Sequence, residues 1–230
     1  MKVIYDPGIP VSERHNSGRL LFGPDGYLYA IVGEHDLFTP AQDLDSPIGK
    51  IHRMTPQGRP APGNPFRDST VFVYGVRNSF GMDYDPATGD LWYTDNGPEC
   101  NDEINRLVPG GNYGWGPSAD CSADPGSERS TNRDGPNPIR PAWAIERTIG
   151  ISGLAFCDGC GLGSRSEGAL FYGDFNLFGI HRLTLSDDRR HVLGEKLVYT
   201  HVRHVLSLET GPDGALYLSD PQAIYRLVPR

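Results

Sequence analysis

Long apolar runs, helical periodicity and positive charge are all scarce in this chain of 230 residues. No segment approaches the roughly 20 apolar residues that a membrane-spanning helix needs, so the sequence predicts no membrane span. Lysine and arginine number 21 against 29 aspartates and glutamates, which gives a formal net charge of −8. Nucleic-acid binders usually carry a basic surface, so the charge argues against nucleic acid as a partner. The acidic balance is compatible with cation binding.

A secretory leader is not visible in the first residues either. "MKVIYDPGIP" lacks the apolar core of a signal peptide and has the pattern of a strand and turn already under way. We therefore expect further chain upstream and interpret residues 1–230 as a single, N-terminally incomplete domain. The first residues give no information on the compartment.

Cysteine is scarce, with four residues at Cys100, Cys121, Cys157 and Cys160. The CxxC in "FCDGCG" is compatible with a redox pair, half of a zinc site or a small disulfide. A second CxxC is missing, and no thioredoxin-like βαβ pattern surrounds the first, which disfavours zinc and a thioredoxin-like site. Two disulfides or free loop thiols remain as alternatives, and disulfides would indicate an exported protein.

Turn residues, in contrast, are abundant, with 29 glycines and 20 prolines spread along the chain. They punctuate a repeated phrase, in which an apolar strand, a Pro-Asp-Gly or Pro-x-x-Gly turn and an alternating strand lead to an acidic residue. Proline presets φ at the first corner and glycine accepts positive φ at the second, so each copy predicts a β-hairpin. The copies are "LLFGPDGYLYAIVGE" (20–34), "MDYDPATGDLWYTDNG" (82–97), "LSLETGPDGALYLSD" (206–220) and, more loosely, "SEGALFYGDF" (166–175).

A similar strand follows each copy of the phrase. These closing strands are "GKIHRMTP" (49–56), "DEINRLVP" (102–109), "FGIHRLTL" (178–185) and "QAIYRLVP" (222–229). Four hairpin-plus-strand units predict an all-β fold, a β-propeller, with about four to five blades in a chain of this length. The alternative is a sandwich of unrelated hairpins. Residues 117–141, rich in Ser, Asp, Pro and Gly, predict a long loop on one face.

His15 precedes the first hairpin, and Glu34 follows its second strand. A hairpin returns the chain to its starting end, so we expect the two side chains on the same face. Histidine titrates near neutral pH and suits a general base, which a carboxylate could orient and stabilise when charged. The alternative is a surface histidine beside a turn.

Arg77 and Asn78 stand together in "VYGVRNSFGMDY". A planar cation followed by an amide can hold a carboxylate or a carbonyl oxygen through several directed hydrogen bonds. The alternative is an arginine that caps or pairs between blades.

The stretch "DNGPECNDEINRLVPGGNYGW" (95–115) combines turns with acidic residues. Hard cations such as calcium bind carbonyl and carboxylate oxygens. Gly97 and Pro98 could supply carbonyls, Asp102 and Glu103 carboxylates, and the bend at 110–113 further carbonyls. The spacing is not that of an EF-hand, and an ordinary acidic turn is the alternative.

These stretches, together and in this order, resemble the soluble quinoprotein glucose/sorbosone dehydrogenases, also called PQQ-dependent aldose sugar dehydrogenases. The resemblance rests on "HNSGRLLFGPDGYLYAIVGE", "AQDLDSPIGKIHRM", "VYGVRNSFGMDYDPATGDLWYTDNGP" and "DEINRLVPGGNYGW". It is strong from Val3 to about Trp115 and continues more loosely to the end of the chain.

The resemblance implies a six-bladed propeller with pyrroloquinoline quinone (PQQ) on its central face. In that family the enzyme oxidises the anomeric carbon of aldoses to lactones, with hydride transfer to PQQ and an external electron acceptor. By resemblance, His15 is the general base and Glu34 the acidic residue that orients it. Arg77, Asn78 and, after a small alignment shift, Arg203 match cofactor-binding residues.

The resemblance also implies calcium. Gly97 and Pro98 match residues whose carbonyls bind the calcium that lies on the quinone, and Glu103 and Tyr113 match a separate structural calcium site. The family implies a periplasmic or secreted protein.

Two other functions remain open. A non-catalytic propeller could bind a ligand or a partner protein on the same face, as Asn176 suggests, because it aligns with a cofactor-contacting lysine of the glucose enzyme. A lactonase or another metal-dependent hydrolase would need metal-binding carboxylates near the central channel, and the sequence offers no persuasive set.

Overall fold

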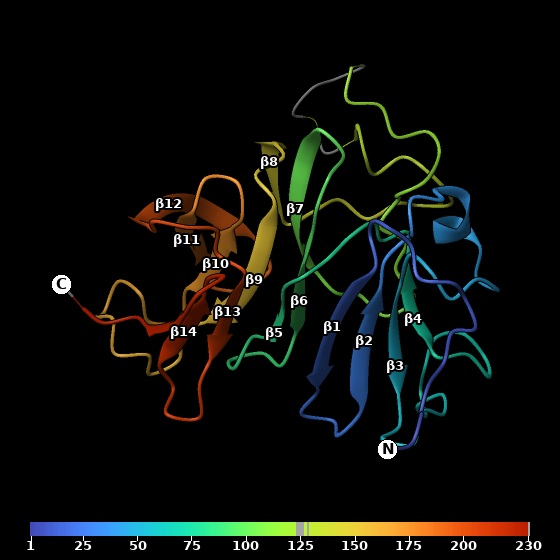
Figure 1. Ribbon diagram of the computed structural model, residues 1–230, viewed down its shortest axis with the longest axis horizontal. Helices are drawn as coiled ribbons and strands as arrows, with labels where there is room; N and C mark the ends of the chain where they lie inside the picture. Colours follow the sequence, from blue (N-terminus) through green and yellow to red (C-terminus); the bar gives the residue numbers. More distant parts are fainter. Residues whose placement is uncertain (123–126, 128, 230) are drawn as a thin grey trace.

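The computed structural model describes residues 1–122, 127 and 129–229, and these form four antiparallel sheets (Figure 1). Blade A contains β1 (Ser17–Phe22), β2 (Leu28–Val32), β3 (Lys50–Met54) and β4 (Val71–Tyr74). Blade B contains β5 (Met82–Tyr84), β6 (Leu91–Asp95), β7 (Cys100–Arg106) and β8 (Trp143–Arg147). Blade C contains β9 (Ile151–Phe156), β10 (Leu170–Asp174), β11 (Gly179–Leu185) and β12 (Val192–Thr200), and blade D contains β13 (Ser207–Thr210), β14 (Leu216–Ser219) and β15 (Ile224–Arg226).

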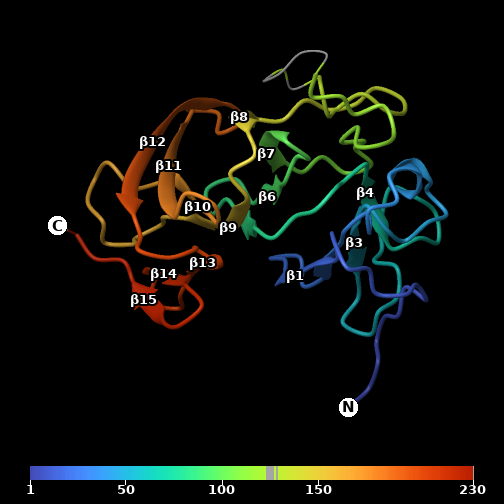
Figure 2. The same cartoon turned by 45° about the horizontal axis from the view of Figure 1, so that its top comes forward.

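Each sheet is a meander in which consecutive strands pair. The first strands face one another from blade to blade, through contacts of β1 with β5, β5 with β9 and β9 with β13. They therefore lie innermost, and the later strands of each blade lie outward (Figure 2). This is the blade arrangement of a β-propeller, so the predicted all-β propeller fold is confirmed. The described residues contain one short 3₁₀ helix, η1 (Thr39–Gln42), and no helix with the length and apolarity of a membrane span.

The hairpin turns form as the repeated phrase predicts. Gly26 and Gly214 adopt φ values of +78° and +77° in the turns of blades A and D. In blade A the Asp25 side chain accepts the N–H of Tyr27 at 3.1 Å, and in blade D Asp213 does the same for Ala215. The looser copy behaves differently: residues 166–175 contain only one strand, β10, and its partner β9 precedes the CxxC loop.

The hydrophobic core lies between neighbouring blades. Strand β6 shows the pattern, because successive side chains point to opposite faces of a strand. Tyr93 packs in the cluster between blades A and B, and Trp92 packs in the cluster between blades B and C. A third cluster joins blades C and D. Packing on both faces holds adjacent blades at fixed positions, and with them the loops at the blade ends.

Every blade buries one carboxylate at the end of its second strand or within two residues of that end. Each of these groups accepts a backbone N–H from a nearby loop: Glu34 from Phe38 (2.9 Å), Asp95 from Arg77 (2.8 Å), Asp174 from Gly179 (2.8 Å) and Asp220 from Gln222 (2.7 Å). Their exposed fractions are between 0% and 5%. The acidic residue that ends the repeated phrase thus organises the loops at one end of each blade.

Both cysteine pairs are disulfides, Cys100–Cys121 and Cys157–Cys160, and no described cysteine is free. This decides between the alternatives that the CxxC left open. The Cys100–Cys121 bond ties the loop at 117–141 to the start of β7. Residues 123–126 and 128 of this predicted loop lie outside the described residues.

Candidate active site

An open cavity of about 510 Å³ lies at the end of the blades that carries the β6–β7 and β10–β11 loops. All four blades or their connecting loops contribute to its wall. The lining residues are His15, Arg77, Asn78, Phe80, Asn96, Gly97, Pro98, Thr148, Gly150, Ile151, Ser152, Phe175 and Leu206. The structure therefore brings five of the predicted site residues to one cavity: His15, Arg77, Asn78, Gly97 and Pro98.

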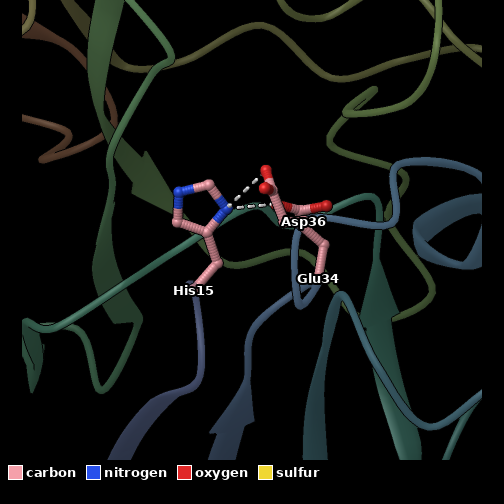
Figure 3. A group of neighbouring side chains, drawn as sticks. All are labelled: His15, Glu34 and Asp36. Carbon is pink, nitrogen blue, oxygen red and sulfur yellow. Dashed lines mark hydrogen bonds and ion pairs between the residues drawn. The ribbon is translucent and has the colours of Figure 1, made fainter. Parts of the chain in front are cut away.

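His15 faces two carboxylates through one ring nitrogen (Figure 3). Its Nδ1 hydrogen-bonds Glu34 Oε1 and lies 3.7 Å from Asp36 Oδ1. In Figure 3 the other ring nitrogen, Nε2, lies on the side of the ring away from both carboxylates. Glu34 fixes Nδ1 as the protonated nitrogen, which leaves Nε2 with a lone pair that can accept a proton.

The backbone around His15 is in an uncommon conformation. His15 has a φ of +56°, in the left-handed region that costs free energy for residues with a side chain. Gly33 packs against it so closely that a Cβ there would lie 1.9 Å from the His15 carbonyl oxygen. The close approach of two backbone segments sets the His15 side chain against Glu34, and only glycine permits it at position 33.

Glu34 remains ionised in its buried position. Burial alone would raise its pKa, but hydrogen bonds from His15 and from the Phe38 amide, together with the charges of His15 and Arg77, lower the pKa below its ordinary value. An ionised Glu34 can both orient the imidazole and stabilise it when it gains a proton.

Arg77 lines the cavity. Its Nη1 donates to the carbonyl oxygens of Asn96 (2.8 Å) and Gly97 (3.0 Å). The guanidinium lies 5.0 Å from the centre of the Trp115 ring, in cation–π geometry. Its Nε is buried without a protein partner, so this N–H remains as a donor for a bound group.

Asp95 holds the backbone of the Arg77–Asn78 pair. Its two carboxylate oxygens accept the N–H groups of Arg77 at 2.8 Å and Asn78 at 2.6 Å. Burial raises the pKa of Asp95 to about 7, although these hydrogen bonds and the Arg77 charge oppose the rise. The acidic residue that ends the phrase in blade B thus aims two predicted cofactor-binding residues.

Gly97 and Pro98 line the cavity beside Arg77. The Gly97 carbonyl accepts one hydrogen bond, from Arg77, and a carbonyl oxygen has a second lone pair for a cation. Asp102, which we expected to supply a cation ligand, instead accepts three backbone N–H groups. A carboxylate engaged in this way is a structural acceptor.

Glu103 and Tyr113 line a second, small cavity of about 10 Å³, room for one water-sized sphere, which shares Arg77, Asn96 and Gly97 with the wall of the large cavity. Burial, followed by the charge of Asp95, raises the pKa of Glu103 to about 8. Two amide oxygens nearby, Oδ1 of Asn101 and of Asn132, are buried without a hydrogen-bond donor. Unpaired oxygens beside a buried carboxyl group fit the ligand set of a hard cation.

Arg203 does not line either cavity. Its Nη1 lies 3.4 Å from Asp220 Oδ2 in blade D, where His201 and Tyr225 also hydrogen-bond that carboxylate. The geometry therefore gives Arg203 a contact with the acidic residue of its own blade.

Three polar residues of the cavity wall had no signal in the sequence. Asn96 Oδ1, Thr148 Oγ1 and Ser152 Oγ are buried without partners. A buried polar atom usually has a hydrogen-bond partner, so these atoms favour a polar ligand in the cavity. These residues can be identified only from the structure, in which segments of blades B and C bring them to the same cavity.

The chain matches known proteins along nearly its whole length. The family model described as Glucose / Sorbosone dehydrogenase matches residues 1–227. The aldose sugar dehydrogenase YliI of Escherichia coli (strain K12) is 30% identical over 216 residues, 89% of this chain and 56% of that protein. The uncharacterized protein slr1608 of Synechocystis sp. is 31% identical over 96% of this chain and 57% of its own length. The chain thus spans a little over half the length of these curated relatives.

Solved structures of dehydrogenases are also similar to this chain. A glucose dehydrogenase superposes with a TM-score of 0.84 at 31% identity, over 98% of this chain and 67% of that one. The PQQ-bound form of an aldose sugar dehydrogenase from Streptomyces coelicolor superposes with a TM-score of 0.75 at 31% identity, over 92% of this chain and 57% of that one. The chain belongs to the glucose/sorbosone dehydrogenase family.

Proposed function

We propose that this chain carries the reaction centre of a PQQ-dependent aldose sugar dehydrogenase, with His15 as the general base. One observation supports it above all: His15, Arg77, Asn78, Gly97 and Pro98 surround a single cavity although they come from three different loops. PQQ is bound in the structure of a relative that is 31% identical.

The residues of the cavity fit such a group. PQQ is a planar, acidic molecule with carbonyl and carboxylate oxygens. The buried Arg77 Nε and the unpartnered Thr148 and Ser152 hydroxyls offer donors to those oxygens. Beside them, the carbonyls of Gly97 and Pro98 would hold a calcium ion.

The chain's own part in the reaction is proton transfer. His15 Nε2 would take the proton of the anomeric hydroxyl of an aldose as its carbon–hydrogen bond breaks, which yields the lactone. Glu34 keeps the ring in the required tautomer and stabilises the imidazolium. Bound PQQ with calcium would supply the hydride acceptor and a positive charge at its oxygens. The overall oxidation requires an external electron acceptor.

We further propose a periplasmic or secreted location. Both disulfides are of the kind that persist in oxidising compartments. The small cavity at Glu103 and Tyr113 is the proposed site of a second, structural calcium.

One observation favours the non-catalytic alternative. PQQ is acidic, yet Arg77 is the only arginine or lysine among the residues that line the described cavity. A binding module with the same face would bind its ligand without turning it over.

Steady-state oxidation tests the proposal. The purified chain is incubated with PQQ and calcium, an aldose is added, and reduction of an artificial dye is followed. We expect reduction that requires PQQ and calcium and is lost in His15→Ala. The control is His191→Ala, an exposed histidine of the β11–β12 turn, which keeps wild-type turnover. Binding of PQQ without turnover would favour the binding module.

A further inference from the structure

Asp102 occupies an unusual position behind the cavity wall. Its side chain on β7 is fully buried, and its Oδ1 accepts the N–H of Gly97 at 2.9 Å. Its Oδ2 accepts the N–H groups of Ile149 and Gly150, each at 2.7 Å. One carboxylate thus receives three backbone donors and has no ion pair with a side chain among the described residues.

The donors come from two blades. Gly97 belongs to the β6–β7 loop of blade B, and Ile149 and Gly150 lie between β8 and β9, at the entrance to blade C. Gly97 and Gly150 both line the cavity. Asp102 therefore hydrogen-bonds two separate segments of the cavity wall, at Gly97 and at Gly150, although it does not line the cavity itself.

The contact with Gly97 also reaches Arg77. The peptide unit of Asn96 and Gly97 is planar, so a hydrogen bond that fixes the Gly97 N–H also fixes the direction of the Asn96 carbonyl. That carbonyl accepts Arg77 Nη1 at 2.8 Å, and the Gly97 carbonyl accepts the same nitrogen at 3.0 Å. Asp102, the 96–97 peptide and the Arg77 guanidinium form one continuous hydrogen-bonded chain.

We propose that Asp102 is a positioning residue that sets the aim of Arg77 toward the bound cofactor. The proposal rests on the function proposed above. Asp102 does not line the cavity and would act through residues that do. Nothing in the sequence repeat signals this role, because the residue lies outside the series of acidic residues that end the second strands.

A matched control exists at the opposite end of the same two blades. Asp85 is also fully buried, accepts the N–H of Ala87 at 2.9 Å and receives Arg189 Nε of blade C at 2.5 Å. It joins blades B and C in the β5–β6 turn, away from the cavity. Asp85→Asn therefore disturbs the same blade interface without disturbing the cavity wall.

The test compares Asp102→Asn with Asp85→Asn in two measurements. In Asp102→Asn an NH₂ group replaces one of the two acceptor oxygens and faces backbone N–H donors. Hydrogen bonds to the two wall segments are then lost, and these segments should open more often. Hydrogen–deuterium exchange of the protein without cofactor should accelerate at least about 10-fold in residues 95–99 and 148–152 for Asp102→Asn and stay at the wild-type rate there for Asp85→Asn. If Asp102→Asn does not fold, Asp102→Ser, which keeps one small acceptor, takes its place.

The second measurement is a fluorescence titration with PQQ in the presence of calcium. We expect the dissociation constant to rise about 10-fold or more in Asp102→Asn and less than about twofold in Asp85→Asn. Unchanged exchange at the two walls, unchanged PQQ affinity in Asp102→Asn, or an equal loss in both variants would overturn the positioning role. If the wild type binds no PQQ, the proposed function fails, and the exchange measurement alone decides whether Asp102 sets the walls.

Discussion

Glu34 accepts a hydrogen bond from His15 Nδ1 on one carboxylate oxygen and from the Phe38 amide, at 2.9 Å, on the other. At the same position in blade B, Asp95 accepts the backbone N–H groups of Arg77 and Asn78, which line the cavity. In blades C and D, Asp174 and Asp220 accept hydrogen bonds from residues that do not line it. In blade A this repeated carboxylate thus orients His15, the proposed general base.

The first prediction concerns this pair. Glu34→Gln keeps an oxygen for the Phe38 amide but removes the charge that stabilises protonated His15. We expect kcat to fall about 100-fold, within the range that a positioned general base contributes. Asp36→Asn is the control, because Asp36 is half-exposed and lies 3.7 Å from Nδ1, and should change kcat less than about threefold. Equal effects of the two variants would remove the special role of Glu34.

A second prediction separates the two arginines that the sequence resemblance assigned to the cofactor. Arg77→Lys loses the planar fork over Trp115, and we expect the dissociation constant for PQQ to rise about 10- to 100-fold. Arg203→Lys should leave it unchanged, because Arg203 contacts Asp220 and does not line the cavity. Fluorescence titration measures both. A loss in Arg203→Lys as large as that in Arg77→Lys would place Arg203 at the cofactor after all.

Calcium should stabilise the chain through the small cavity at Glu103. A ligand at about 100 times its dissociation constant adds about 2.7 kcal/mol to the free energy of unfolding, or roughly 5–10 °C in Tm for a domain of this size. Glu103→Gln removes the carboxyl group that would bind the ion as a carboxylate and should abolish most of that increase. Differential scanning calorimetry with calcium and with a chelator measures the effect. An undiminished calcium response in Glu103→Gln would contradict a site there.

Stability should also depend on pH through His181 in blade C. Its ring nitrogens lie 3.1 Å from Asp174 and 2.7 Å from Glu195. Burial opposes protonation, but these hydrogen bonds and charges raise the pKa of His181 from 6.5 to about 9. A pKa that is higher in the folded state stabilises the protein fully below the unfolded value, and the contribution is lost as pH rises through the folded value.

His181 alone should therefore lower the free energy of unfolding by about 3 kcal/mol between pH values below 6.5 and above 9, since each pKa unit corresponds to about 1.4 kcal/mol. Urea unfolding across this range measures it. In His181→Gln the slope over the same range should be reduced. An identical slope in wild type and variant would show that other groups control the pH dependence.

Much of the fold follows from local sequence. The turn residues and alternating strands predict the hairpins of blades A, B and D and all four closing strands, because their conformation depends on neighbours in the chain. The outer strands β4, β8 and β12 carry no repeated phrase, and the partner of β10 lies beyond the CxxC loop. The pairings of β4, β8 and β9 join segments far apart in the chain, whereas β12 pairs with β11 across a short turn that contains neither proline nor glycine.

Some residues of the site could likewise be identified from local sequence, and others could not. His15 and Glu34 could be paired from the sequence because one hairpin separates them, and the geometry of a hairpin returns the chain to its start. Thr148 and Ser152 could not be found, because a hydroxyl becomes informative only when it is buried without a partner in a cavity that other blades complete. Asp102 was visible as an acid, but whether its oxygens face a cation or backbone amides is a property of the folded chain.

The central claim is that His15 removes the proton of the substrate hydroxyl in a cavity that holds PQQ. The most direct test is a single-turnover experiment, in which protein loaded with PQQ and calcium is mixed with an excess of aldose and the quinone absorbance is followed by stopped flow. We predict rapid bleaching in the wild type and a rate at least about 100-fold lower in His15→Ala with PQQ affinity retained. Bleaching at the same rate in both proteins would contradict the claim.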